Sequence, residues 1–101
     1  MAKPSPVHPE PQRAIKGFVS GRVQGVGFRY RAYHKALSFS LSGWVRNLDD
    51  GRVEFLVQGQ TEKIEAFARW IDHGDPPARI DRLDLGRVAP DPGLRGFEIV
   101  D

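Results

Sequence analysis

The pattern of apolar and polar positions changes its period along the chain, and each change predicts an element. Residues 15–23, IKGFVSGRV, are rich in β-branched residues and predict a strand. Beyond Phe28 the apolar positions recur at helical spacing instead. The stripe of this first helix consists of Phe28, Ala32, Ala36 and Phe39, widened by Tyr33 and Leu37.

A hairpin is predicted over residues 43–58. The runs GWVRNL and RVEFLVQ flank Asp49-Asp50-Gly51, and Asp-Gly between two β-rich runs is typical of a tight turn. In the second run Val53, Phe55 and Val57 alternate with other residues, so one face of that strand is fully apolar.

A second helix follows the hairpin. Its apolar stripe consists of Ile64, Phe67, Ala68 and Ile71, at i, i+3, i+4 and i+7. We expect Thr61 to cap its start and His73-Gly74 to end it. Residues 80–88 and 97–100 are then short strand candidates.

The resulting order is β-α-β-β-α-β with a final short strand. Two helices of this length cover one face of a sheet, which predicts an α+β fold of the ferredoxin-like type, with an antiparallel sheet and both helices on one side. We place this domain at residues 14–101. Residues 1–13 contain four prolines and few apolar groups, and are expected to form a disordered or extended tail.

Composition narrows the class of protein. A chain of 101 residues suits one domain, and the absence of cysteine excludes disulfides, thiolate metal sites and a cysteine nucleophile. It also fits a reducing cytosol, so we expect a cytoplasmic protein. No run approaches the roughly 18 apolar residues of a membrane helix. The net charge of +2 suits small anionic substrates better than nucleic acid.

The segment 22–29 joins the first strand to the first helix and has the features of an anion site. Backbone N–H groups at a helix start are unpaired, and Gly25 and Gly27 let the backbone curl around an oxyanion. Arg29 and Arg31 fall in the first helical turn, where a cation is disfavoured by about 0.3–1 kcal/mol unless an anion binds there. Glycine-containing loops are also common in this fold class, and such arginines often extend into water.

Asn47 is the second unusual residue. It shares a strand face with Gly43 and Val45, and a buried amide requires hydrogen-bond partners. Two interpretations remain open at this point: Asn47 bonds the backbone of the hairpin, or its carboxamide orients a water molecule.

These residues resemble the acylphosphatase family. Residues 21–29, GRVQGVGFR, meet its pattern G-x-V-Q-G-V-x-F-R, and residues 43–54, GWVRNLDDGRVE, meet G-x-V-x-N-x-x-D-G-x-V-E. The similarity extends from about Lys16 to Val100.

The resemblance implies a ferredoxin-like enzyme that hydrolyses small acylphosphates to carboxylate and phosphate, with no metal or other cofactor. It implies that backbone N–H groups of the loop cradle the phosphoryl oxygens, that Arg29 clamps them, and that Asn47 holds the attacking water. The substrate-binding loop residues are Gln24, Gly25, Val26, Gly27 and Phe28. The phosphoryl group itself accepts the proton, and His8, His34 and His73 lie outside both motifs. The motifs do not specify the acyl group.

One position departs from the family, which usually has glycine at the end of the first helix where this chain has Ser40. If residue 40 is left-handed, serine there costs roughly 1 kcal/mol relative to glycine.

Three rival functions remain. A ferredoxin-like sheet can bind RNA on exposed aromatics, here Phe18, Trp44, Phe55 and Phe97, although the stacked aromatic signature is absent. The same loop also occurs in carbamoyl phosphate-handling domains of larger proteins. A non-catalytic anion-binding domain is the third. We expect a monomer with neither nucleic-acid nor membrane partners.

Overall fold

The computed structural model describes residues 12–101, and its elements follow the predicted order. They are β1 (Arg13–Arg22), α1 (Phe28–Ser38), β2 (Ser42–Asn47), β3 (Val53–Gly59), α2 (Thr61–His73), β4 (Arg79–Val88) and β5 (Phe97–Val100). The predicted tail lies mainly outside the described residues. Its last residue, Arg13, is the first residue of β1.

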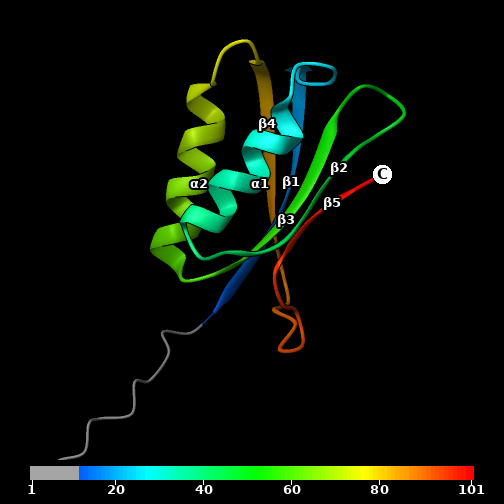
Figure 1. Cartoon of the computed structure of the whole chain (residues 1–101). Helices are drawn as coiled ribbons and strands as arrows, with labels where there is room; N and C mark the ends of the chain where they lie inside the picture. Colours follow the sequence, from blue (N-terminus) through cyan, green and yellow to red (C-terminus); the bar gives the residue numbers. More distant parts are fainter. Residues whose placement is uncertain (1–11) are drawn as a thin grey trace, which may run out of the picture.

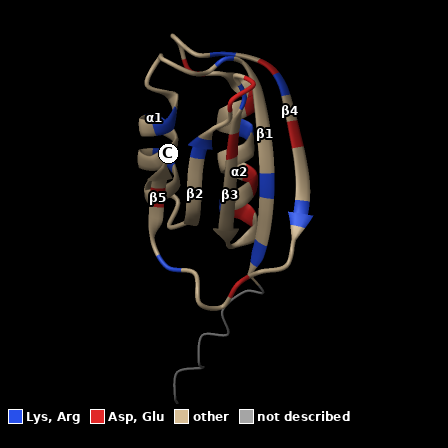
Figure 2. Cartoon of the chain, turned by 90° about the vertical axis from the view of Figure 1, so that its right-hand side faces the viewer, with Lys and Arg blue, Asp and Glu red and all other residues tan. Residues whose placement is uncertain are grey.

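The strands form one sheet in the order β4-β1-β3-β2-β5, with both helices on one of its faces (Figures 1 and 2). The pairs β1·β3, β1·β4 and β2·β3 are antiparallel, as expected. The edge strand β5 instead pairs parallel to β2, which makes the sheet mixed. The ferredoxin-like α+β fold is confirmed. Within the described chain, neither helix is long and apolar enough to cross a membrane.

The core lies between the sheet and the helices. Its buried residues from β3, α1 and α2 are Val53, Phe55, Val57, Phe28, Ala32, Ala36, Ile64, Phe67 and Ile71. The predicted stripes are therefore confirmed, except at Leu37, whose exposed fraction is 45%. Leu37 lies nine residues after Phe28, which is about two and a half helical turns and places it on the opposite side of α1.

The helix-free face of the sheet carries a buried carboxylate. Glu54 on β3 is 3% exposed, and its oxygens lie 2.7 Å from Arg46 Nη2 and 3.5 Å from Lys16 Nζ. Both cations also lie over the ring of Trp44, at 5.4 Å for Arg46 Cζ and 5.9 Å for Lys16 Nζ. Arg52, in the turn before β3, lies over the ring of Phe18 in the same way, with its Cζ 4.8 Å from the ring centroid. Two of the four aromatic residues named for RNA binding, Phe55 and Phe97, are buried at 1% and 7% exposure, which argues against the RNA-binding interpretation.

Thr61 is not the cap of α2, contrary to expectation. The N-cap is Gln60, which has extended backbone angles and whose carbonyl accepts from the backbone N–H groups of Lys63 and Ile64, both at 3.0 Å. Thr61 is therefore already helical, and none of the described side chains caps this helix start. The other end agrees with the prediction, since Gly74 ends α2 with a φ of 83°.

Ser40 has a φ of 58°, so the left-handed conformation considered for this position is present. The backbone N–H of Ser40 donates to Leu37 O at 3.0 Å, and that of Leu41 donates to Ala36 O at 2.9 Å. This pair of bonds is the Schellman arrangement, in which glycine is the preferred residue at the left-handed position.

We predict that Ser40→Gly raises the melting temperature by about 4–8 °C, because a gain of about 1 kcal/mol shifts a domain of this size by that amount. Thermal unfolding followed by circular dichroism measures it. The matched control is Ser38→Gly, two residues earlier in the helix, which should lower the melting temperature because glycine is a poor helix former. A lower melting temperature for Ser40→Gly would contradict this assignment.

Candidate active site

A pocket of about 210 Å³ lies where the β1–α1 loop and the first turn of α1 meet the ends of β2 and β5. Its lining residues are Val23, Gly25, Gly27, Phe28, Arg29, Tyr30, Asn47 and Ile99. The fold therefore brings the loop of the first motif and the asparagine of the second to one hollow.

The loop leaves backbone donors free at the start of α1. Gly25 and Gly27 have φ values of 75° and 78°, which residues with a Cβ rarely adopt. Gly27 is the N-cap of α1 and has no side chain to bond the first N–H groups, and no acidic residue lies in the first turn. Unpaired N–H groups together with the positive end of the helix dipole form an anion site.

Arg29 places its guanidinium beside this helix start. Its Nη1 donates to Val100 O at 3.1 Å and lies 3.7 Å from Asp101 Oδ1. The C-terminal end of β5 and the residue after it therefore fix one nitrogen of the guanidinium. Within residues 12–101 its hydrogen bonds use Nη1 alone, which leaves Nε and Nη2 as donors toward a ligand. A planar fork with two free donors suits a tetrahedral oxyanion.

Asn47 presents an acceptor without a partner. Its Oδ1 is buried and accepts no hydrogen bond from the described part of the chain. The hairpin beside it is closed by backbone bonds, Leu48 N–H to Arg52 O at 2.8 Å and Gly51 N–H to Leu48 O at 3.2 Å. This disfavours the interpretation of Asn47 as a hairpin-bonding residue. A buried acceptor left unpaired costs about 1–3 kcal/mol of stability. A ligand or water that donates a hydrogen bond to Oδ1 would remove this cost.

Gln24 does not line the pocket with its side chain. Its Nε2 donates to Leu48 O at 2.7 Å and to Arg52 O at 3.0 Å, which ties the first motif to the hairpin of the second. The side chain of Val26 packs against the core. Of these two loop residues, only the backbone N–H groups remain candidates for contact with a ligand.

Arg31 has a different explanation from the one the sequence suggested. Its Nη1 donates to Val26 O at 2.9 Å and its Nη2 to Asp75 O at 3.2 Å. Its Nε lies 3.1 Å from Asp75 Oδ2 as an ion pair that is not aligned as a hydrogen bond. The positive charge of Arg31 is therefore balanced by Asp75, and the side chain braces the loop against the α2–β4 connection.

Two pocket residues were missed by the sequence analysis. Tyr30 lies next to Arg29 on α1 and is 61% exposed, but nothing in the helical stripe marks it. Ile99 reaches the pocket because β5 pairs parallel to β2, opposite Val45, and that pairing has no signal in the local pattern.

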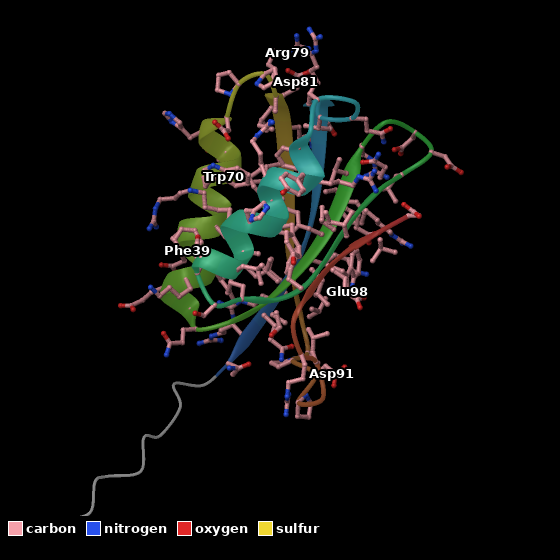
Figure 3. The ribbon with its side chains drawn as sticks, in the orientation of Figure 1. Phe39, Trp70, Arg79, Asp81, Asp91 and Glu98 are labelled. Carbon is pink, nitrogen blue, oxygen red and sulfur yellow. The ribbon has the colours of Figure 1, made fainter. Side chains whose placement is uncertain are left out.

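The groups with displaced pKa values lie outside the pocket. The backbone N–H of Arg52, followed by its guanidinium, lowers the pKa of Asp50 in the hairpin turn. The guanidinium of Arg79 lowers the pKa of Asp81 at the start of β4 (Figure 3). Within residues 12–101, no group of three or more His, Cys, Asp or Glu side chains is placed to hold a metal ion.

Known proteins are similar to this chain over most of its length. A family model described as acylphosphatase matches residues 15–99, which contain both motifs. An acylphosphatase of Trichormus variabilis is 48% identical over 82 residues, covering 81% of this chain and 80% of the relative. The crystal structure of acylphosphatase from Bacillus subtilis has a TM-score of 0.83 at 36% identity, covering 88% of this chain and 99% of that one. Full-length HypF, in a phosphate- and nucleotide-bound form, gives 0.78 at 30% identity, but the match covers 89% of this chain and 12% of HypF.

We predict that Gln24→Glu lowers the free energy of unfolding by about 1–3 kcal/mol, because it sets a carboxylate against two carbonyl oxygens that now receive hydrogen bonds. Urea denaturation measures the change. Gln60→Glu is the matched control, since Gln60 caps α2 without a side-chain bond and a negative charge there is neutral or mildly stabilising. Equal stability of the two variants would argue against this link between the motifs.

Proposed function

The chain belongs to the acylphosphatase family, and we propose that it carries out that family's hydrolysis in the pocket at the start of α1, with Arg29 binding the phosphoryl group and Asn47 placing the water. The observation that carries these roles is the buried Oδ1 of Asn47, which has no hydrogen-bond partner among residues 12–101 and lies in the pocket that Arg29 also lines.

Binding of the phosphoryl group rests on positive potential and unpaired donors. The N–H groups between Gln24 and Arg29 surround the phosphoryl oxygens, and Nε and Nη2 of Arg29 donate hydrogen bonds to two of these oxygens. Donors fixed in advance stabilise the charge on the equatorial oxygens in the transition state without having to reorganise.

Water attack follows from the acceptor at Asn47. A water molecule that donates a hydrogen bond to Oδ1, and keeps that proton, turns a lone pair toward phosphorus. A new O–P bond forms as the bond from phosphorus to the carboxyl oxygen breaks, and the electron pair leaves with the carboxylate. A phosphoryl oxygen takes the water's other proton. Because carboxylate is a good leaving group, neither a general acid nor a metal is required in this scheme.

The alternative is a carbamoyl phosphate-handling or non-catalytic anion-binding domain. The match to 12% of HypF supports the idea that such a domain can sit within a larger protein. The Asn47 acceptor favours hydrolysis, since binding an anion alone has no use for an acceptor in the pocket. We further propose a cytoplasmic monomer, which light scattering after size exclusion tests for its oligomeric state.

We predict that the wild type hydrolyses benzoyl phosphate in the presence of EDTA, and that Arg29→Ala and Asn47→Ala each lower kcat/KM by about 10²–10³-fold. Inorganic phosphate should still inhibit residual activity in Asn47→Ala and lose that effect in Arg29→Ala. Arg69→Ala, an exposed arginine on α2, is the control and should match the wild type.

Each result decides one part of the proposal. Wild-type protein that binds phosphate but hydrolyses nothing would establish the anion-binding alternative. Activity that requires an added metal would contradict the metal-free scheme. Loss of phosphate inhibition in Asn47→Ala would move that residue from water placement to phosphate binding.

A further inference from the structure

The pocket is smaller than the usual site for a small organic ligand. Sites that enclose small organic ligands measure about 300–1,000 Å³, whereas this pocket measures about 210 Å³. It has room for a phosphoryl group and the atoms next to it. The remainder of any larger acyl group must therefore lie outside the pocket.

A second hollow adjoins the pocket across Tyr30. This groove of about 390 Å³ runs between α1 and α2, and Tyr30 lines both hollows. Its lining residues are Tyr30, Arg31, His34, Lys35, Ser38, Trp70 and Asp75. Figure 3 shows Trp70 of α2 where the two helices come together, with Phe39 near the end of α1.

The direction of the reaction points toward this groove. Asn47 and Ile99 line the pocket from the sheet, and Tyr30 lines it from α1. In-line displacement places the leaving group on the side of phosphorus away from the water that Asn47 holds. The acyl group therefore leaves the pocket on the side of α1, where Tyr30 begins the groove.

The groove carries an unbalanced positive charge. Within the described chain no acidic side chain lies within ion-pair distance of Lys35 Nζ, which lies 5.6 Å from the ring centroid of Trp70. The other cation, Arg31, is already paired with Asp75. The opposite side of the pocket, beside β5, instead carries the carboxylate of Asp101, 3.7 Å from Arg29 Nη1.

We propose that the groove between α1 and α2 is the acyl-binding subsite and that Lys35 selects acyl groups bearing a second negative charge. Lys35 supplies the charge, and Trp70, which stacks on Phe28 with ring centroids 5.9 Å apart, lies beneath Lys35 at 5.6 Å and holds it in the groove. This inference rests on the proposed function, because it assigns the acyl half of the same substrate.

The test compares two substrates that differ by one carboxylate. Benzoyl phosphate and 4-carboxybenzoyl phosphate share a rigid ring, and the second bears a charge at its far end. The measured quantity is the ratio of kcat/KM for the carboxylated substrate to that for the plain one. We expect a ratio above one in the wild type and a ratio about two- to fivefold lower in Lys35→Gln, as for a screened surface ion pair.

Lys63→Gln is the matched control, since Lys63 is an exposed lysine on α2 outside the groove. Its ratio should equal that of the wild type, whereas Lys35→Glu should give the lowest ratio of the series. High salt should reduce the wild-type preference, because it screens exposed charges. Melting temperatures confirm that each variant is folded.

The outcomes separate the subsite from the activity. Hydrolysis of benzoyl phosphate with the same ratio in wild type and Lys35→Gln would overturn the subsite and leave the proposed function standing. Equal falls in the ratio for Lys35→Gln and Lys63→Gln would also overturn it, since net charge alone would then explain the preference. Hydrolysis of neither substrate by the wild type would overturn the proposed function, and this inference with it.

Discussion

The side-chain amide of Gln24 joins the two parts of the chain that make the pocket. Its Nε2 donates to Leu48 O and Arg52 O, the carbonyls on either side of the β2–β3 turn. These carbonyls lie within a few residues of Asn47, so the same two bonds set the distance from the loop of the first motif to the amide of Asn47. A shift of about 1 Å between such groups is enough to reduce catalysis about a hundredfold. The relative placement of the motifs thus depends on a residue whose side chain does not line the pocket.

The pocket contrasts with the opposite face of the sheet in how polar groups are satisfied. On that face the buried carboxylate of Glu54 has two cationic partners, and those cations in turn lie over Trp44. At the pocket, α1 begins with neither a side-chain cap nor an acidic residue, and Oδ1 of Asn47 has no partner within residues 12–101. Buried polar groups are otherwise almost always paired, so unsatisfied groups gathered in one hollow are a sign of function.

Features set by local chemistry were predictable from the sequence, and features set by distant contacts were not. The Asp-Gly hairpin follows from a few neighbouring residues and was predicted correctly, and the left-handed Ser40, considered only as a condition, follows from its place at the end of α1. The Arg31–Asp75 pair joins residues 44 positions apart. The local sequence therefore showed an arginine in the first turn of a helix, where a cation is disfavoured, but not the carboxylate that balances it. The parallel pairing of β5 with β2, which brings Ile99 to the pocket, equally depends on the closed sheet.

The same division applies to the candidate site itself. The motifs contain the groups proposed to act on the phosphoryl half of the substrate, namely backbone N–H groups, one guanidinium and one amide, and these demand a particular local sequence. The residue proposed to meet the acyl half, Lys35, lies in a groove between two helices and follows no motif, because it need only lie on a surface that faces the substrate. Side chains on helix surfaces can change without disturbing the loop that binds phosphate. Two chains with identical motifs can therefore share the reaction and still differ in the acyl group they prefer, and the groove between α1 and α2 is where such a difference would arise.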